Sequence, residues 1–172
     1  MKKILLQTNS WQRLFISVAF FASLSSLVFG QKIAGEMNPL SSIVSSPDYQ
    51  TDRTRVSYAM KRCSALYTVT GLVMMEKMGE SKIGKEMTEL GAIYADGSMQ
   101  LDMAIQKSRN PKVNTTNEDW QKSTIDMINR ISNIYIADMK NSADRTGDFF
   151  SSGYKSDMNI CKDLSKYTKA NK

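Results

Sequence analysis

The sequence contains no histidine, and this absence excludes more chemistry than any other feature of the composition. Without an imidazole, the chain cannot form a Ser-His-Asp or Cys-His catalytic site, a histidine-ligated zinc site or a histidine pH switch. The Gly-x-Ser-x-Gly, Walker A and Gly-x-Gly-x-x-Gly motifs are also missing. We therefore expect a protein that is not an enzyme and that has no cofactor or metal site.

Proline and cysteine are scarce, whereas methionine is abundant. The 172 residues include three prolines, two cysteines and twelve methionines, and 41% of the residues are apolar. Few prolines and the lack of strand-like alternation favour long helices over a turn-rich β-sandwich. A chain of this length can form one hydrophobic core.

The first 30 residues have the organisation of a secretory signal peptide. Lys2 and Lys3 make a basic start, Arg13 is the last charge, and an uncharged run over 14–29 leads to Gly30, where we expect cleavage. As a helix this run would rise about 24 Å, less than the ~30 Å hydrocarbon core, which favours cleavage over retention as an anchor. Either outcome places the remainder in the periplasm or outside the cell, with membrane contact only if the signal is uncleaved.

The net charge of +6 overstates how basic the exported part is. Three of the 23 basic residues lie in the signal, so 20 remain against 17 acidic residues, a balance of +3. These charges are spread along the chain and form no block. We therefore expect no nucleic-acid partner.

Cys63 and Cys161 are the only cysteines. An even number in an exported chain predicts a disulfide. The bond would close a loop of about 97 residues, worth roughly 4–5 kcal/mol in the chain-entropy model. A redox-active dithiol is not expected, because Cys-x-x-Cys is absent.

Four helices are predicted within a helical domain over 47–172, after a flexible lead-in over 31–46. Ser46 as N-cap and Pro47 as first residue predict a first helix over about 47–78. A second helix is expected over about 81–108, and a third from the Thr116 cap to just before Gly147. A fourth helix follows a turn at 148–153. The fold class is therefore all-α: an antiparallel four-helix bundle closed by one disulfide.

The second predicted helix has two distinct faces. Its apolar stripe consists of Ile83, Met87, Leu90, Tyr94, Leu101 and Ile105. Beside the stripe runs a ribbon of small residues, which would let another backbone approach closely: Gly84, Gly91, Ala95 and Ser98. The alternative is that Gly91 or Gly97 breaks this helix in two.

An uncharged segment, Ser64–Met75, covers most of the circumference of the first helix. The segment fits the central helix of a bundle, but one side could stay exposed for a partner, a second copy or a lipid. Methionines off the main stripes make adaptable binding surfaces. The predicted interaction surface is Leu72, Met74, Met75, Met99 and Met103.

The leading hypothesis is a non-enzymatic, exported helical protein that binds another protein or an envelope component and that could form a homodimer. A first alternative is a small-molecule carrier with a pocket between its helices. A second is a glycan hydrolase using two carboxylates, for which Asp102 and Asp138 are the acids nearest the apolar faces.

Overall fold

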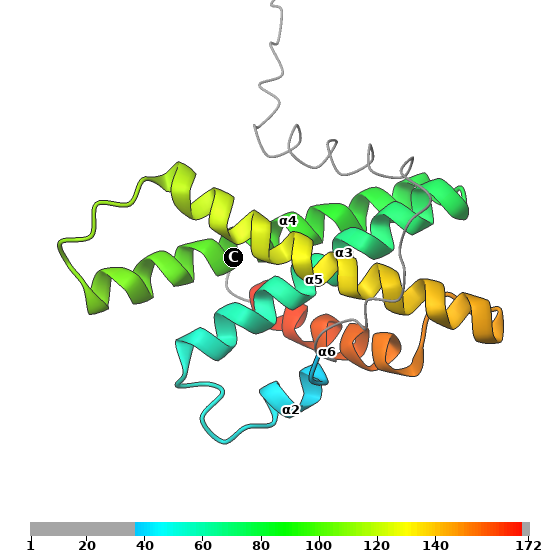
Figure 1. Ribbon diagram of the computed structural model, residues 1–172, viewed down its shortest axis with the longest axis horizontal. Helices are drawn as coiled ribbons and strands as arrows, with labels where there is room; N and C mark the ends of the chain where they lie inside the picture. The colour runs from blue at the N-terminus through cyan, green and yellow to red at the C-terminus, as the bar shows by residue number, and fades with distance from the viewer. Residues whose placement is uncertain (1–36, 170–172) are drawn as a thin grey trace, which may run out of the picture. The chain divides into compact units, whose positions relative to one another are not determined.

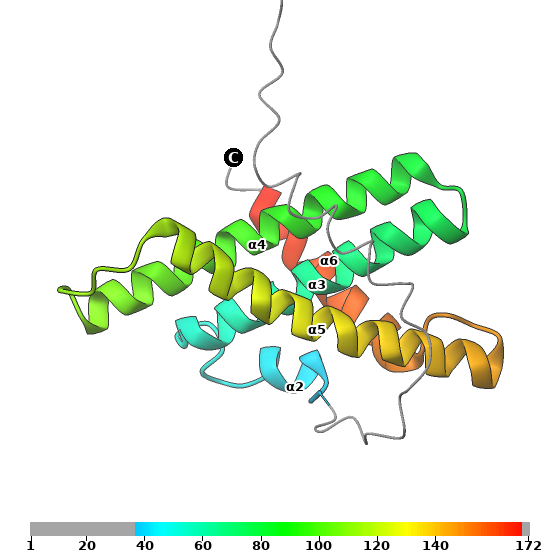
Figure 2. The same cartoon turned by 45° about the horizontal axis from the view of Figure 1, so that its top comes forward.

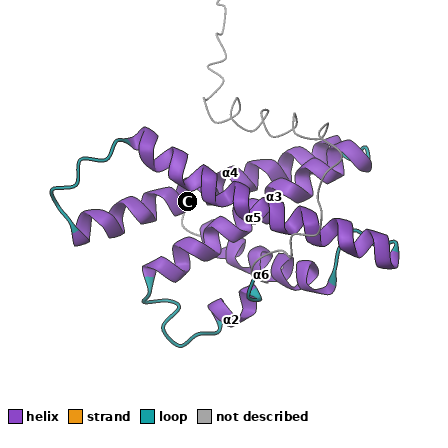
Figure 3. Ribbon diagram, viewed as in Figure 1, coloured by secondary structure: helices purple, strands orange, loops and turns teal. Residues whose placement is uncertain are grey.

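The computed structural model describes residues 37–169, with side chains up to residue 165. The predicted signal peptide lies outside these residues. Figure 3 shows helices joined by loops, and the described part contains no strand. The elements are α2 (Leu40–Val44), α3 (Arg53–Lys77), α4 (Ser81–Arg109), α5 (Asn117–Thr146) and α6 (Ser152–Lys169). The all-α prediction is confirmed.

The four long helices alternate in direction along the chain. α3 and α4 form a long antiparallel hairpin, α5 crosses both of them, and α6 returns beside α3 (Figures 1 and 2). α3 lies at the centre, because it contacts each of the other four helices. Residues 62–71 of α3 are all buried, as expected for the central helix of a bundle.

The disulfide joins Cys63, near the middle of α3, to Cys161 in α6. Both cysteines are fully buried. The predicted pairing is confirmed, and a disulfide of this kind is typical of proteins in a non-reducing compartment.

The N-terminal end of α3 differs from the prediction. The cap is Asp52, whose carboxylate accepts hydrogen bonds from the backbone N–H groups of Thr54 and Arg55. The predicted cap, Ser46, lies in the turn that precedes α3 and bonds to Asp48 instead. Both positions carry a capping signal, and the one that satisfies two helix N–H groups marks the start of the helix.

The lead-in predicted as flexible over 31–46 contains the short helix α2. Its Leu40 is fully buried, and α2 contacts α3 and α6. The sequence does not reveal this element, because five residues are too few to show a helical period.

The ends of the other helices agree with local signals. Thr116 caps α5 in a reciprocal capping box with Asp119, and Gly147 ends the helix with φ 75°. α4 is one continuous helix, so neither Gly91 nor Gly97 breaks it. The continuity of α4 is what allows its small-residue ribbon to run along α3.

Candidate functional site

Backbones of α3 and α4 approach closely at glycines. A Cβ atom added at Gly84 would lie 2.7 Å from the carbonyl oxygen of Gly71, and one added at Gly71 would lie 2.6 Å from the carbonyl oxygen of Gly84. The predicted ribbon is buried along its whole length: Gly84, Gly91, Ala95 and Ser98. The small residues of α4 therefore make its main contact, as predicted.

The apolar stripe of α4 lies at the flank of this contact. Of its six residues only Tyr94 is buried, and Ile83 is 42% exposed. The other four are half-buried: Met87, Leu90, Leu101 and Ile105. The reason is steric, since two helices meet most closely where side chains are smallest.

Apolar residues gather around the α3–α4 turn, and we call this group the hairpin end. It consists of Leu72, Met74, Met75, Met78, Ile83 and Met87. Met78 is 54% exposed, more than any other large apolar side chain that the structure describes as exposed. The hairpin end and the C-terminal end of α5 diverge in both views of the fold (Figures 1 and 2). This end of the hairpin therefore lacks the cover that α5 gives to the middle of α3.

The uncharged Ser64–Met75 segment is fully buried over only part of its length. Residues 64–71 are buried in the bundle, whereas residues 72–75 are half-buried. The Met75 side chain lies over Gly84, where an added Cβ would be 2.2 Å from its Cγ. Full burial of the segment therefore ends at Gly71.

The five residues of the predicted interaction surface are all half-buried, but they form two groups. Leu72, Met74 and Met75 belong to the hairpin end. Met99 and Met103 flank Asp102, on the far half of α4. Fifteen residues of helix separate Gly84 from Met99, a rise of about 22 Å. Sequence reasoning missed Met78 and Ile83, although Gly79 already marked the turn beside them.

A polar cluster of Ser57, Lys61 and Asp102 closes the other end of the α3–α4 contact. The Ser57 hydroxyl donates to Asp102 Oδ1 at 2.5 Å. Lys61 Nζ donates to Ser57 Oγ at 3.1 Å and forms an ion pair with Asp102. Ser57 is 1% exposed, and its hydroxyl is held between Asp102 and Lys61. The geometry is that of a structural ion pair between two helices.

A second polar cluster, of Arg62, Tyr135 and Asp157, lies inside the bundle. Arg62 is 1% exposed and forms an ion pair with Asp157, which is 3% exposed. The Tyr135 hydroxyl accepts from Arg62 Nε at 3.2 Å and donates to Asp157 Oδ2 at 2.7 Å. Burial raises the pKa of the Tyr135 hydroxyl above its ordinary range.

Sequence reasoning missed this buried pair, although the spacing contained a signal for it. Arg62 shares a helical face with Ala59, Leu66 and Val69, and Asp157 lies four residues before Cys161. A charge on an apolar face near a predicted disulfide indicates a buried partner of opposite sign.

Two further buried tyrosines make hydrogen bonds within the core. The hydroxyls of Tyr154 and Thr70 lie 2.6 Å apart, and burial raises the pKa of Tyr154 to about 12. The Tyr94 hydroxyl donates to the carbonyl oxygen of Cys161 at 3.2 Å. Burial also raises the pKa of Tyr94. These phenols stay neutral and serve packing, the usual role of buried tyrosine.

The two acids considered for hydrolysis each have a partner. Asp102 pairs with Lys61, and Asp138 accepts a hydrogen bond from Ser151 Oγ at 2.5 Å. Neither is among the buried residues.

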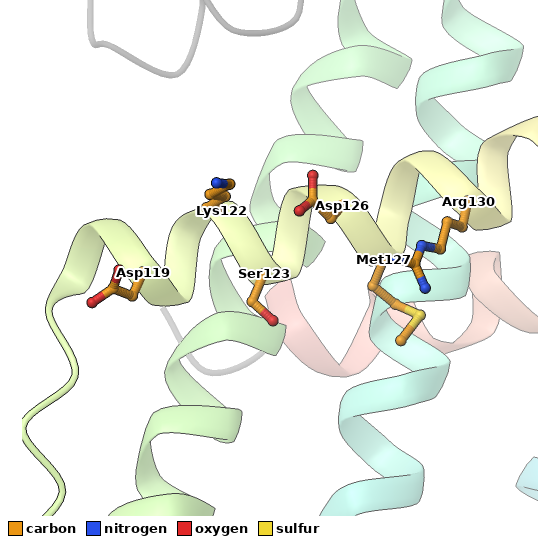
Figure 4. A pocket seen from close by; sticks show the side chains of 6 residues that line it. All are labelled: Asp119, Lys122, Ser123, Asp126, Met127 and Arg130. Carbon is orange, nitrogen blue, oxygen red and sulfur yellow. The ribbon is translucent and has the colours of Figure 1, made fainter.

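A shallow hollow of about 290 Å³ lies along α5. It is lined by Asp119, Lys122, Ser123, Asp126, Met127 and Arg130, all exposed. Figure 4 shows Lys122 and Asp126 on one side of the helix, and Ser123 and Met127 on the other. The hollow is thus an open, charged stretch of helix surface, unlike the apolar pocket that a carrier would need.

Among residues 37–169, no group of three or more cysteine, aspartate or glutamate side chains could hold a metal ion. No helix in this range is long and apolar enough to cross a membrane. Comparisons with protein-family models, with curated proteins and with solved structures found no match for this chain.

Proposed function

We propose that this protein is a non-enzymatic binding protein that recognises another protein of the cell envelope or exterior through its hairpin end. The observation that carries this proposal is the contrast along α3. Residues 62–71 are fully packed, while the next apolar residues, 72–75, are half-buried and continue into the exposed Met78 and Ile83. Clustered apolar side chains at a protruding end are a common feature of binding surfaces.

Methionine suits this role because its side chain is unbranched and polarisable. Four of the six hairpin-end residues are methionines: Met74, Met75, Met78 and Met87. Such side chains adapt to an irregular partner surface more readily than branched ones. The close α3–α4 contact holds the two backbones rigidly beneath them, which lowers the entropic cost of binding.

Export to the periplasm or the exterior belongs to the same proposal. The basic start and uncharged run of residues 1–30 support it from the sequence. The buried disulfide is in keeping with it, because such bonds persist outside reducing compartments. A short, lysine-led signal favours a bacterial source.

The test is a quantitative pull-down from the native envelope with the exported protein, its Ile83→Glu variant and an Ile136→Glu control. Ile136 lies on α5, is not one of the hairpin-end residues, and is 46% exposed. We expect the wild type and the control to retain the same partner protein. Ile83→Glu should retain at least about tenfold less of it, because the variant places a charge at the centre of an apolar contact.

Several results would contradict the proposal. Equal retention of the partner by all three proteins would show that the hairpin end is not part of the interface. Binding of envelope lipid or glycan alone would replace the protein partner with an envelope component. A doubled mass in solution that Ile83→Glu returns to the single-chain value would identify the partner as a second copy. Unchanged circular dichroism of both variants shows that the fold is intact.

A further inference from the structure

The N-terminal segment of the described chain contacts the C-terminal helix α6 inside the protein. The backbone N–H of Leu40, the first residue of α2, donates to Asp157 Oδ1 of α6 at 3.0 Å. These residues are 117 positions apart in the sequence. Leu40 is fully buried, and α2 contacts α6 as well as α3. The segment Asn38–Val44 therefore packs on the first half of α6.

The same carboxylate belongs to the buried ion pair with Arg62. Arg62 also donates to the backbone carbonyl oxygen of Asn38. The N-terminal segment thus gives one N–H to Asp157 and one carbonyl oxygen to Arg62. If α6 moved away, the Leu40 N–H and the Arg62 guanidinium would both lose Asp157 as a partner, which is costly for buried groups.

The disulfide determines where α6 sits on α3. Cys63 follows Arg62 directly, and Cys161 lies one helical turn after Asp157. The covalent bond and the ion pair therefore join the same two helices at adjacent turns. Holding Cys161 at Cys63 also holds Asp157 within reach of Arg62 and of Leu40.

We propose that the disulfide is a latch that holds α6 and the Asn38–Val44 segment as one cooperative unit on a scaffold of α3, α4 and α5. Opening the latch takes two electrons and two protons from a dithiol reductant, yields the two cysteine thiols, and converts the dithiol to its disulfide. Both elements then release together. This inference does not depend on the binding role of the hairpin end.

Hydrogen exchange of a Cys63→Ser/Cys161→Ser variant tests the latch directly. We expect the amides of Leu40–Val44 and Ser152–Lys169 to lose protection together, by at least about tenfold, because both elements rely on one buried cluster. Amides in the middle of α3, α4 and α5 should lose less protection than the amides of these two elements do. Loss of protection in α6 with wild-type protection in α2 would overturn the proposal.

A reciprocal test keeps both cysteines and stays informative if the serine variant unfolds. Coupling between two sites is mutual, so weakening the docking of α2 must favour opening of the disulfide. Because both cysteines are fully buried, dithiothreitol reaches the disulfide only when this unit opens, and we expect Leu40→Ala to be reduced about tenfold faster than the wild type. Ser41→Ala, at an exposed position of the same helix, should match the wild type within about twofold.

A control variant separates the latch from general destabilisation. Ile128 is buried in α5, outside the proposed unit. Ile128→Ala creates a core cavity, as Leu40→Ala does, and lowers global stability. If Ile128→Ala speeds reduction as much as Leu40→Ala at equal stability, reduction proceeds through global unfolding and the latch is disproved.

Discussion

Gly91 lies where the backbones of α3 and α4 come close together. An added Cβ would be 2.5 Å from Thr68 Oγ1, 3.1 Å from the carbonyl oxygen of Ser64 and 3.2 Å from the backbone nitrogen of Thr68. Two of these three atoms are backbone and cannot rotate away. The close contact between α3 and α4 therefore requires a residue without a side chain at position 91.

Alanine at this position should destabilise the protein, although alanine is the better helix former. Gly91→Ala should lower the free energy of unfolding by about 1–3 kcal/mol, the usual cost of overpacking. Gly153→Ala is the control, because its nearest neighbouring atom would be 3.7 Å away. That variant should be unchanged or more stable by up to about 1 kcal/mol. Urea unfolding of both variants decides, and equal effects would refute the close approach.

Tyr154 gives the protein a dependence on alkaline pH. Burial raises its pKa from 10.0 to about 12, so the folded chain keeps the phenol proton more tightly than the unfolded chain does. The resulting stability is fully present below pH 10 and is lost as the pH rises towards 12. Tyr154→Phe cannot titrate, so its unfolding free energy should fall less over this window, by up to about 3 kcal/mol. Urea unfolding at pH 9, 10, 11 and 12 measures this, and identical slopes for the two proteins would contradict it.

Among the elements, α3 shows how competing local signals are resolved. Ser46 and Asp52 both precede stretches that could begin a helix, and Ser46 is followed by Pro47, a good first residue. In the structure Asp52 accepts two helix N–H groups, and the chain between the two candidates forms turns. The extra turns let the chain reverse so that α2 can dock on α3 and α6.

The choice of cap is open to a direct test. Asp52→Ala should cost about 0.5–2 kcal/mol of unfolding free energy, because two N–H groups of α3 lose their acceptor. Ser46→Ala should cost less than about 0.5 kcal/mol, since its contacts are at the surface. Thermal unfolding monitored by circular dichroism compares the two. A larger loss of stability from Ser46→Ala than from Asp52→Ala would instead support the longer helix predicted from the sequence.

At the scale of the whole molecule, the disulfide joins the central helix α3 to α6. The residues that it links are 98 positions apart, so the unfolded chain is strongly constrained by the bond. The Cys63→Ser/Cys161→Ser variant should lose about 4–5 kcal/mol of unfolding free energy. Guanidinium unfolding measures the loss, and a cost below about 1 kcal/mol would show that the unfolded chain gains little freedom. Intact mass should show the wild type two hydrogens lighter than its reduced form.

The sequence by itself determined the features that arise within a few residues of one another, or that admit a single solution. The Thr116 capping box and Gly147 bound α5 because caps act within one turn, and two cysteines allow one intramolecular pairing. The small-residue ribbon of α4 could be predicted because helical spacing alone puts its members on one face.

Only the tertiary structure decided what each face touches. The ribbon packs on α3 while the apolar stripe is left at the flank, and Arg62 is buried because Asp157 reaches it from α6. Leu40 is buried for the same reason, since α2 packs against α3 and α6, which form only later in the sequence. Burial depends on which elements meet, and the free energy of that meeting is shared among residues that no local pattern connects.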